Sequence, residues 1–332
     1  MSAAAETAES IITDLHSGSR RALSRSLSLI ESTLVSDREI AFAVLEHCSA
    51  PSTTSWRIGC TGPPGVGKST FIEQLGIQLT DMGRRVAVLA VDPSSRRTGG
   101  SILGDKVRMP LLSQRPEAYI RPTPSKAVLG GAAPSTRDAI LLCEEAGFDT
   151  IIIETVGVGQ SEVEVAGMVD MFLLLALPNS GDDVQGIKRG IMEAAHTIIV
   201  TKSDIDLAAA HRAVATLTGA LRYMHPPVDD WTTAVLPVSS PSAEGFTAVM
   251  ESVAEFFAPA RRLSIDSRRQ QQRGEWFDSV LAGEVLQQLL SRSPLRSACE
   301  YAREQCIRGQ VAPSLSVHRL LGRIHLTITE DV

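Results

Sequence analysis

The sequence has few cysteines, no hydrophobic run long enough to cross a membrane, and no excess of positive charge. Its five cysteines form no CxxC pair and no zinc-ligand spacing, a pattern typical of isolated thiols in a reducing cytosol. The apolar stretch MFLLLAL at 171–177 is far too short to span a bilayer. With 32 basic and 38 acidic residues, the formal net charge is −6, which argues against binding to nucleic acid or to an anionic membrane. We therefore expect a cytoplasmic protein.

The sequence also argues against a histidine metal site and against a secretory signal. The seven histidines are scattered without metal-ligand spacing, so we expect no metal site built from them. Glu6, Glu9 and Asp14 follow no leading basic stretch, which argues against a secretory signal. With 332 residues, of which 43% are apolar, the chain is long enough for one large domain with additions or for two domains.

Six short apolar runs alternate with helical patterns through the middle of the chain. Because they lack polar alternation, they indicate parallel strands covered by helices on both faces. Several end in a polar or glycine cluster, and in open α/β sheets ligands bind beyond the carboxyl ends of the strands. The runs are WRIGCTG, RRVAVLAVD, DTIIIET, DMFLLLALP, HTIIVTKSD and TAVLPVSS. The predicted fold class is α/β, with a mostly parallel sheet flanked by helices.

Both ends of the chain are predicted to be helical. Apolar residues recur at three- and four-residue steps near the start, at Leu23, Leu27, Ile30 and Leu34. After a strongly polar stretch, apolar pairs form a wide helical stripe at 276–290. We therefore predict three parts: a helical N-terminal extension at 1–50, a sheet domain at 51–258 and a helical C-terminal region at 259–332.

The strongest motif is GPPGVGKS, which fits G-x-x-x-x-G-K-[ST] and stands between the strand-like WRIGCT and the helical TFIEQLGIQL. Its glycines let backbone N–H groups converge on phosphate oxygens, and the helix N-terminus adds its dipole. We expect Lys68 to contact the β and γ phosphates, Ser69 to ligate Mg²⁺ and Thr70 to contact the α phosphate. An ordinary glycine turn is the alternative, but the context favours a phosphate-binding loop (P-loop) for a nucleoside triphosphate. Its expected nucleotide-binding residues are Gly62, Pro63, Pro64, Gly65, Val66, Gly67, Lys68, Ser69 and Thr70.

The segment ETVGVGQSE follows DTIII directly, so an acid and two glycines stand where a buried run ends. One interpretation is a surface acid at the end of a strand. The other is that Glu154 holds Mg²⁺ and Gly157 offers its N–H to the γ phosphate. GTPases more usually have Asp here, and Glu reaches one methylene further. With a P-loop upstream, we favour the metal-binding interpretation.

Two more acids, Asp92 and Asp105, follow another strand-like run and are separated by a glycine-rich stretch. Loops of this kind can order around Mg²⁺ and the γ phosphate and relax after hydrolysis. An irregular loop with solvated acids is the alternative. We count both residues as candidate metal ligands.

The motif TKSD at 201–204 follows the run HTIIV, and [NT]-K-x-D at this place in GTPases recognises guanine. Asp204 is expected to accept hydrogen bonds from guanine N1–H and the 2-amino group, while the Lys202 stem covers the purine face. Adenine lacks that pair of donors and would leave the carboxylate unpaired. The motif therefore favours guanine, with Ser240, Pro241 and Ser242 after the next strand as candidates to close over the base.

The segment LPNSGDDVQGIKRG at 177–190 also follows a strand-like run. A lysine near the phosphates, here Lys188, would stabilise transition-state charge as an arginine finger does. A solvated charged loop is the alternative. Our candidate catalytic residues are Lys68, Lys188, Asp182 and Gln160.

Together these motifs resemble one family, the MeaB-like (ArgK-type) GTPase chaperones of adenosylcobalamin-dependent acyl-CoA mutases. The resemblance runs from GSRRALSRSLSLIE to the QQR-x-x-W segment near 271–276 and so covers most of the chain. The residues that carry it are GPPGVGKST, VDPSS, TGGSILGDKVRM, ETVGVGQSE, LPNSGDDVQGIKRGIME and TKSD. One departure is Thr201, where the family normally has Asn. A Thr hydroxyl can still join the base loop to the P-loop.

The resemblance implies a P-loop GTPase that docks on a mutase such as methylmalonyl-CoA mutase, gates cofactor loading and protects or reactivates that enzyme. It implies GTP or GDP as ligand and Mg²⁺ near Ser69, Asp92, Asp105 and Glu154, with no tightly held cobalamin. It also implies hydrolysis that is slow alone and assisted by Lys188 once the mutase is engaged. A homodimer through the C-terminal helices and contact with a cobalamin adenosyltransferase are further implied.

Two other classes remain alternatives. A nickel-enzyme maturation GTPase has the same P-loop architecture, but such proteins need a cysteine or histidine cluster that the sequence lacks. An ArgK-type kinase linked to amino-acid transport would need a base that activates the acceptor, and none is recognisable.

Overall fold

The computed structural model of the protein describes residues 3–48, 54–92, 108–124, 133–155, 161–178, 189–291 and 293–322. Its strands are β1 Trp56–Thr61, β2 Val86–Asp92, β3 Ala118–Pro124, β4 Thr150–Thr155, β5 Met171–Ala176, β6 Thr197–Val200 and β7 Ala234–Pro237. Helices before and between the first strands are α1 Ala3–His16, α2 Arg20–Ile30, α3 Val35–His47, α4 Lys68–Asp81, α6 Pro110–Ser113 and α7 Ala133–Glu145. The later helices are α8 Ser161–Ala166, α9 Arg189–Ala194, α10 Leu207–Leu221, α11 Phe246–Phe256, α12 Arg262–Ser291, α13 Ser293–Ile307 and α14 Pro313–Leu321.

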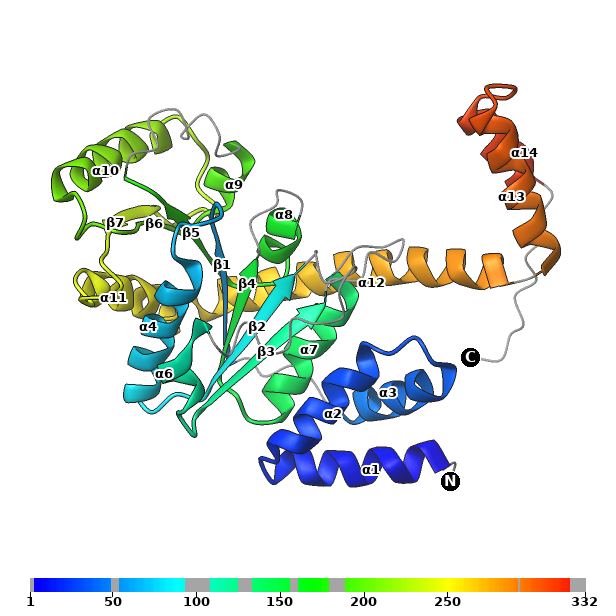
Figure 1. The fold of residues 1–332 in the computed structure, drawn as a ribbon, viewed down its shortest axis with the longest axis horizontal. Coiled ribbons are helices and arrows are strands. Elements are labelled where there is room, and N and C mark those ends of the chain that lie inside the picture. The colour runs from blue at the N-terminus through cyan, green and yellow to red at the C-terminus, as the bar shows by residue number, and fades with distance from the viewer. Residues whose placement is uncertain are drawn as a thin grey trace. The chain divides into compact units, whose positions relative to one another are not determined.

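The strands form one parallel sheet in the order β3-β2-β4-β1-β5-β6-β7 (Figure 1). The predicted α/β fold is therefore confirmed, and all six predicted runs are strands. The seventh strand, β3, was not predicted because Pro122 and Pro124 interrupt its apolar pattern. Proline is tolerated at a sheet edge, and β3 occupies an edge.

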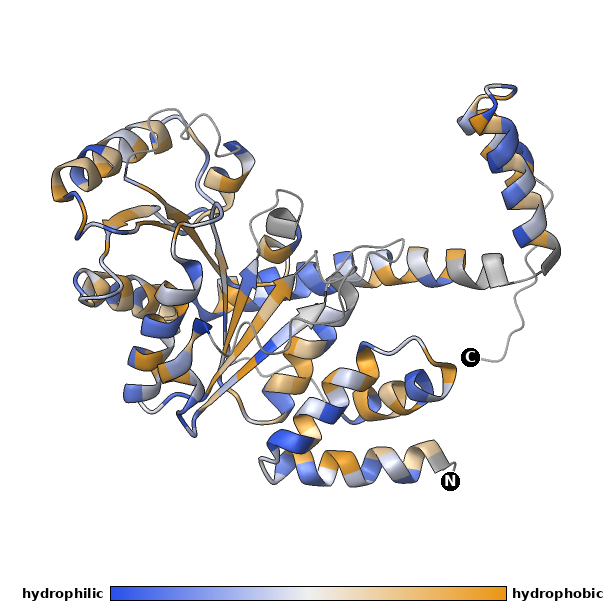
Figure 2. Cartoon of the chain, viewed as in Figure 1, coloured by the Kyte–Doolittle hydropathy of each residue, from blue (hydrophilic) through white to orange (hydrophobic). Residues whose placement is uncertain are grey.

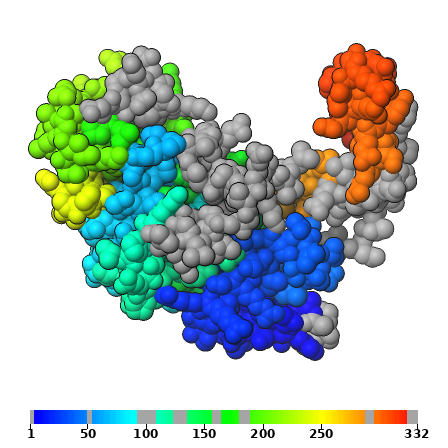
Figure 3. Space-filling model, viewed as in Figure 1, coloured from blue at the N-terminus to red at the C-terminus, as the bar shows by residue number. Residues whose placement is uncertain are grey.

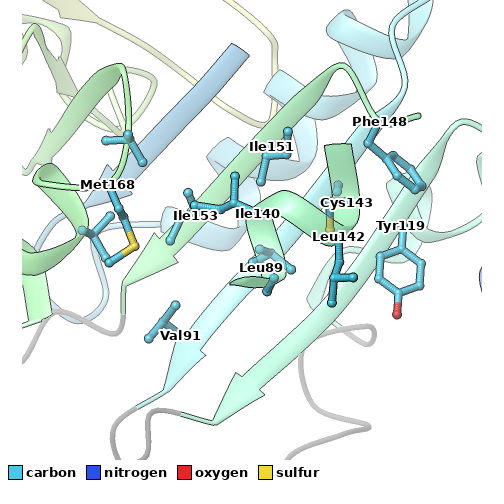
Figure 4. Packing of buried hydrophobic residues seen from close by; sticks show 14 of the residues in the cluster. Leu89, Val91, Tyr119, Ile140, Leu142, Cys143, Phe148, Ile151, Ile153 and Met168 are labelled. Carbon is cyan, nitrogen blue, oxygen red and sulfur yellow. The ribbon is translucent and has the colours of Figure 1, made fainter. Parts of the chain in front are cut away.

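Alternate residues of most strands enter two separate cores, because successive side chains of a strand point to opposite faces. On β4, Ile151 and Ile153 belong to the core that contains α7 residues, whereas Ile152 belongs to the core that contains residues of α4 and α11. Figure 4 shows Ile140, Leu142 and Cys143 of α7 against the β2 and β4 side chains of the first core. The apolar colour of the strands in Figure 2 reflects this two-sided burial.

The N-terminal helices join the first of these cores. Leu15, Leu23 and Leu27 are at most 1% exposed and cluster with residues of α7. Figure 3 shows the blue N-terminal helices directly beside the blue-green segment that precedes β3. Leu34, in contrast, is 63% exposed because α2 ends at Ile30, four residues before the last position of the predicted helical stripe.

Arg20 on α2 holds the edge of the sheet. Its Nη2 donates to the carbonyl oxygens of Arg115, Pro116 and Ala118 at 3.1, 2.7 and 2.7 Å. On the same helix, the Ser24 hydroxyl is hydrogen-bonded to the hydroxyl of Tyr119 at 2.9 Å. The start of β3 is therefore covered by a charged side chain and a polar pair.

The chain divides into two compact units, residues 1–274 and 275–332, so the boundary falls inside α12. The predicted division at 51, 258 and 259 remains a prediction. The first half of α12 belongs to the larger unit, where Arg269 and Gln272 are buried. None of the residues of the smaller unit whose burial is described (275–286 and 295–322) is buried, and Phe277, Tyr301 and Ile307 are 66–70% exposed. Within the described residues, no helix is long and apolar enough to cross a membrane.

Candidate functional site

The P-loop connects the end of β1 to the start of α4, and its shape depends on glycine. Gly62, Gly65 and Gly67 have φ of +151°, +77° and +96°, values that side chains rarely adopt. A Cβ at Gly62 would lie 2.6 Å from the carbonyl oxygen of Leu175 on β5. Gly62 therefore lets the loop turn directly against the neighbouring strand.

Lys68, the first residue of α4, is buried at 9% exposure and lies over its own loop. Its Nζ donates to the carbonyl oxygens of Gly62 and Pro63 at 2.6 and 3.0 Å. The ammonium group is therefore held by carbonyl oxygens of the same loop whose N–H groups a P-loop offers to phosphates. The predicted contact of Lys68 with the β and γ phosphates remains a prediction.

Ser69, in the first turn of α4, contacts Glu154 of β4. The Ser69 hydroxyl donates to Glu154 Oε1 at 3.1 Å, and Glu154 is only 6% exposed. The sequence allowed two interpretations of Glu154, a surface acid at the end of a strand or a metal ligand. Its burial rules out the first. A hydroxyl and a carboxylate side by side supply the hard oxygen ligands that Mg²⁺ prefers, so these residues fit the ion.

The thiol of Cys60 is affected by the charges of both Glu154 and Lys68. Burial raises the pKa of Cys60, the charge of Glu154 raises it further, and Lys68 acts in the opposite direction. The thiol therefore stays protonated at neutral pH and cannot act as a nucleophile. Cys60 contributes to the core on the α4 face of the sheet, as expected for an isolated cysteine.

The base loop after β6 is attached to the P-loop. The Thr201 hydroxyl lies 2.7 Å from the carbonyl oxygen of Val66 and 3.2 Å from that of Ala176. Thr201 is 2% exposed, so this contact is shielded from water. The predicted tie between the two loops is present with Thr in place of Asn.

The remaining residues of the base loop lie beside the segment after β7 and leave the Asp204 side chain exposed. Lys202 adopts φ +57°, and the backbone N–H of Ser203 donates to Val238 O at 3.2 Å, which places TKSD beside the segment after β7. Asp204 is exposed, while Asp206 caps α10 by accepting from Ala209 N at 2.8 Å. The acid that we predict to read the base is therefore accessible from solvent.

The segment after β7 forms a tight turn. The Ser242 hydroxyl and backbone N–H both approach Ser239 Oγ, at 2.7 and 3.4 Å. Ser240 is partly buried, whereas Pro241 and Ser242 are exposed. A Cβ at Gly245 would lie 2.3 Å from Pro237 O, so the turn closes on the end of β7. Their predicted contact with the base remains a prediction.

Several predicted residues lie outside the described part of the chain: Asp105, Gly157, Gln160, Asp182 and Lys188. Asp92 is the last residue of β2, which pairs with β4, so its backbone lies at the same edge of the sheet as Glu154. Within the P-loop, Pro63 and Gly67 are partly buried, Val66 is buried, and Pro64, Gly65 and Thr70 are exposed. No group of three metal-ligating side chains occurs among the described residues.

Sequence reasoning missed one pair at this edge. Thr61 and Thr155, the last residues of β1 and β4, are both 0% exposed, and their hydroxyls lie 2.7 Å apart. The only available signal was a hydroxyl at the end of two otherwise apolar runs. It could not be interpreted without the register of the two strands.

The parallel sheet, the P-loop between β1 and α4 and the TKSD loop after β6 define the class as a P-loop GTPase. The solved structure of an LAO/AO transport system kinase has this fold, with a TM-score of 0.73, 31% identity, and coverage of 96% of this chain and 97% of that chain. The family model for methylmalonyl Co-A mutase-associated GTPase MeaB matches residues 23–293. The chain belongs to this family.

Curated relatives agree over nearly the whole length. A probable GTPase of Mycobacterium tuberculosis is 42% identical over 324 residues, which cover 97% of this chain and 96% of that protein. The mitochondrial methylmalonic aciduria type A homolog of Mus musculus is 41% identical over 323 residues, which cover 94% of this chain and 78% of that protein.

Proposed function

We propose that this chain is a Mg²⁺-dependent GTPase that docks on an adenosylcobalamin-dependent acyl-CoA mutase and gates loading of its cofactor. One observation carries the nucleotide part. The P-loop, the Ser69–Glu154 pair and the TKSD loop are joined at a single edge of the sheet, through contacts of 3.1 and 2.7 Å. The family's described association with methylmalonyl Co-A mutase supports the choice of partner.

Ser69 and Glu154 are the proposed inner ligands of Mg²⁺, with Asp92 and Asp105 as further ligands. When bound, the ion stabilises negative charge on the phosphates. Lys68 and the loop N–H groups hold the β and γ phosphates, and Asp204 with Lys202 selects guanine. Ser69 then links metal binding directly to the first turn of α4.

Hydrolysis is proposed to be slow in the isolated protein. Gln160 orients the attacking water, and Lys188, in the same segment as Asp182, adds positive charge to the transition state as an arginine finger does. Docking of the mutase brings Lys188 into place. GTP binding and hydrolysis then switch the mutase-binding surface between two states.

The smaller unit is proposed to mediate a homodimer. Phe277, Tyr301 and Ile307 are exposed there, and none of residues 275–286 and 295–322 is buried, so these helices need a partner to bury apolar surface. We further propose a cytoplasmic location, contact with a cobalamin adenosyltransferase, and no cobalamin held by this chain itself.

Nucleotide selectivity tests the base site. Calorimetry with GTP, ATP and xanthosine triphosphate should give tightest binding for GTP. In Asp204→Asn the side-chain amide donates where the carboxylate accepted. GTP affinity should therefore fall by about tenfold or more, and xanthosine triphosphate should gain. Asp206→Asn is the matched control, because Asn caps a helix as well as Asp does and GTP binding should not change. Equal affinity of the wild type for ATP and GTP would refute the assignment.

The partner is tested by GTP hydrolysis with and without purified methylmalonyl-CoA mutase. Stimulation by the mutase is expected in the wild type and absent from Lys188→Ala, which should still bind GTP. A hydrolysis rate unchanged by the mutase counts against the chaperone role. Transfer of labelled phosphate from GTP to an acceptor other than water would support the kinase alternative.

A further inference from the structure

The end of β1 and the end of β4 are joined by two side chains that the proposed chemistry does not use. Thr61 immediately precedes Gly62 of the P-loop, and Thr155 immediately follows Glu154. Their hydroxyls are 2.7 Å apart, a normal separation for an O–H···O hydrogen bond. The pair thus joins the residue before the phosphate loop to the residue after a proposed metal ligand.

The register of the sheet explains why these two residues meet. β1 and β4 pair in parallel up to Cys60 and Glu154, so the next residue on each strand lies on the same face. On that face the preceding β4 residues are Ile151 and Ile153, both in the apolar core. Glu154 points to the opposite face, where it meets Ser69 of α4. The hydroxyl pair therefore joins the two strands on the face behind the Glu154 side chain.

Burying a purely apolar pair at this position would cost less free energy than burying two hydroxyls. Valine has almost the same shape as threonine, and a hydroxyl taken from water loses solvation that only a hydrogen bond restores. Both threonines are 0% exposed. A packing requirement alone is met by valine, so the hydroxyls indicate that a directional connection between the two strand ends is needed.

We propose that the Thr61–Thr155 hydroxyl pair is a positioning element for GTP hydrolysis, which holds the Glu154 carboxylate at a fixed distance from the P-loop. The inference rests on the proposed Mg²⁺-dependent GTPase function. Neither threonine is proposed as a catalytic residue, because the pair lies on the face of the sheet opposite the contact between Glu154 and Ser69. Their effect passes through the β4 backbone to Glu154 and from there to Ser69.

Substitutions at Thr155 separate hydrogen bonding from packing. Thr155→Val keeps the shape and removes the hydroxyl, whereas Thr155→Ser keeps the hydroxyl and removes a methyl group. We expect kcat of Thr155→Val to fall roughly tenfold to a hundredfold, the range that follows from a small misplacement of a catalytic group. In Thr155→Val the Mg²⁺ concentration for half-maximal activity should rise, whereas its GTP affinity should stay within about threefold of the wild type. In Thr155→Ser, kcat and the Mg²⁺ dependence should stay within about twofold of the wild type.

The double variant tests whether the two hydroxyls act as one unit. Thr61→Val should also show the loss in kcat seen in Thr155→Val, and Thr61→Val/Thr155→Val should be no worse than Thr61→Val alone. Circular dichroism and thermal melting establish that each variant is folded. If Thr155→Val does not fold, Thr61→Val removes the same bond and carries the same expectation.

Two results overturn the proposal. One is a folded Thr155→Val with kcat and Mg²⁺ dependence within about twofold of the wild type. The other is an equal loss in Thr155→Ser and Thr155→Val, which would assign the effect to packing. A wild type that hydrolyses no GTP, or does so without Mg²⁺, instead refutes the proposed function and removes the basis of the inference with it.

Discussion

The ion pair between Arg269 and Asp170 gives the sharpest prediction about stability. Arg269 Nε and Nη2 donate to the two Asp170 carboxylate oxygens at 2.7 and 2.5 Å, and Nη2 also donates to Ser55 O at 2.7 Å. The side chains are 2% and 1% exposed. Burial lowers the pKa of Arg269, but its hydrogen bond and attraction to Asp170 outweigh burial and raise it. The pair joins the first half of α12 to the amino ends of β1 and β5.

Arg269→Met removes the guanidinium group while keeping most of the apolar stem. The Asp170 carboxylate then stays buried with the backbone N–H of Arg57, at 3.0 Å, as a remaining donor. Removing one partner of a buried pair costs about 3–5 kcal/mol, and the remaining hydrogen bond favours the lower end. Because 1 kcal/mol shifts Tm by about 2–4 °C in large domains, we expect a fall of about 6–12 °C.

Thermal and urea unfolding followed by circular dichroism measure this effect. Arg115→Met is the matched control, because Arg115 pairs with Asp81 while their side chains are 33% and 58% exposed. A pair so exposed contributes about 0–1 kcal/mol, so its Tm should change little. An Arg269→Met protein as stable as Arg115→Met would refute the claim that the buried pair anchors α12.

Gly62→Ala should abolish nucleotide binding in calorimetry, because its Cβ would meet Leu175 O at 2.6 Å. Gly219→Ala, where a Cβ meets nothing within 4 Å, should bind normally. Burial raises the pKa of Asp138 from 3.8 to about 7, so the folded protein retains a proton that the unfolded chain loses. Stability should therefore fall as pH rises through this window, and Asp138→Asn should raise Tm at pH 8 but not at pH 4. Thr201→Val loses the 2.7 Å contact to the P-loop, and guanine nucleotide affinity should fall about tenfold in a binding titration.

Local signals explain what was predictable from the sequence. The strand, loop and helix around GPPGVGKS could be predicted because the signals for them, glycine backbone freedom and helical periodicity, lie within about ten residues of one another. The polar ends of DTIIIE and HTIIVTKSD indicated one edge of the sheet because parallel strands share a direction. The nucleotide class was therefore accessible before the fold was known.

Contacts between distant segments were not accessible. Which hydroxyl faces Thr155 depends on strand register, which no local pattern of β1 determines. The partner of Asp170 lies 99 residues further along the chain. Strand β3 escaped prediction because its prolines are unfavourable in isolation and tolerated only at an edge. In each case the deciding information was tertiary.

The contact of Arg20 with the edge of the sheet has a practical consequence for anyone dividing this chain. A fragment that began after α3 would lose the guanidinium that occupies three main-chain acceptors beside β3. It would also bare the surface of α7 on which Leu23 and Leu27 rest. An uncovered strand edge next to an apolar patch invites self-association. A well-behaved nucleotide-binding fragment must therefore retain the helices that precede the P-loop.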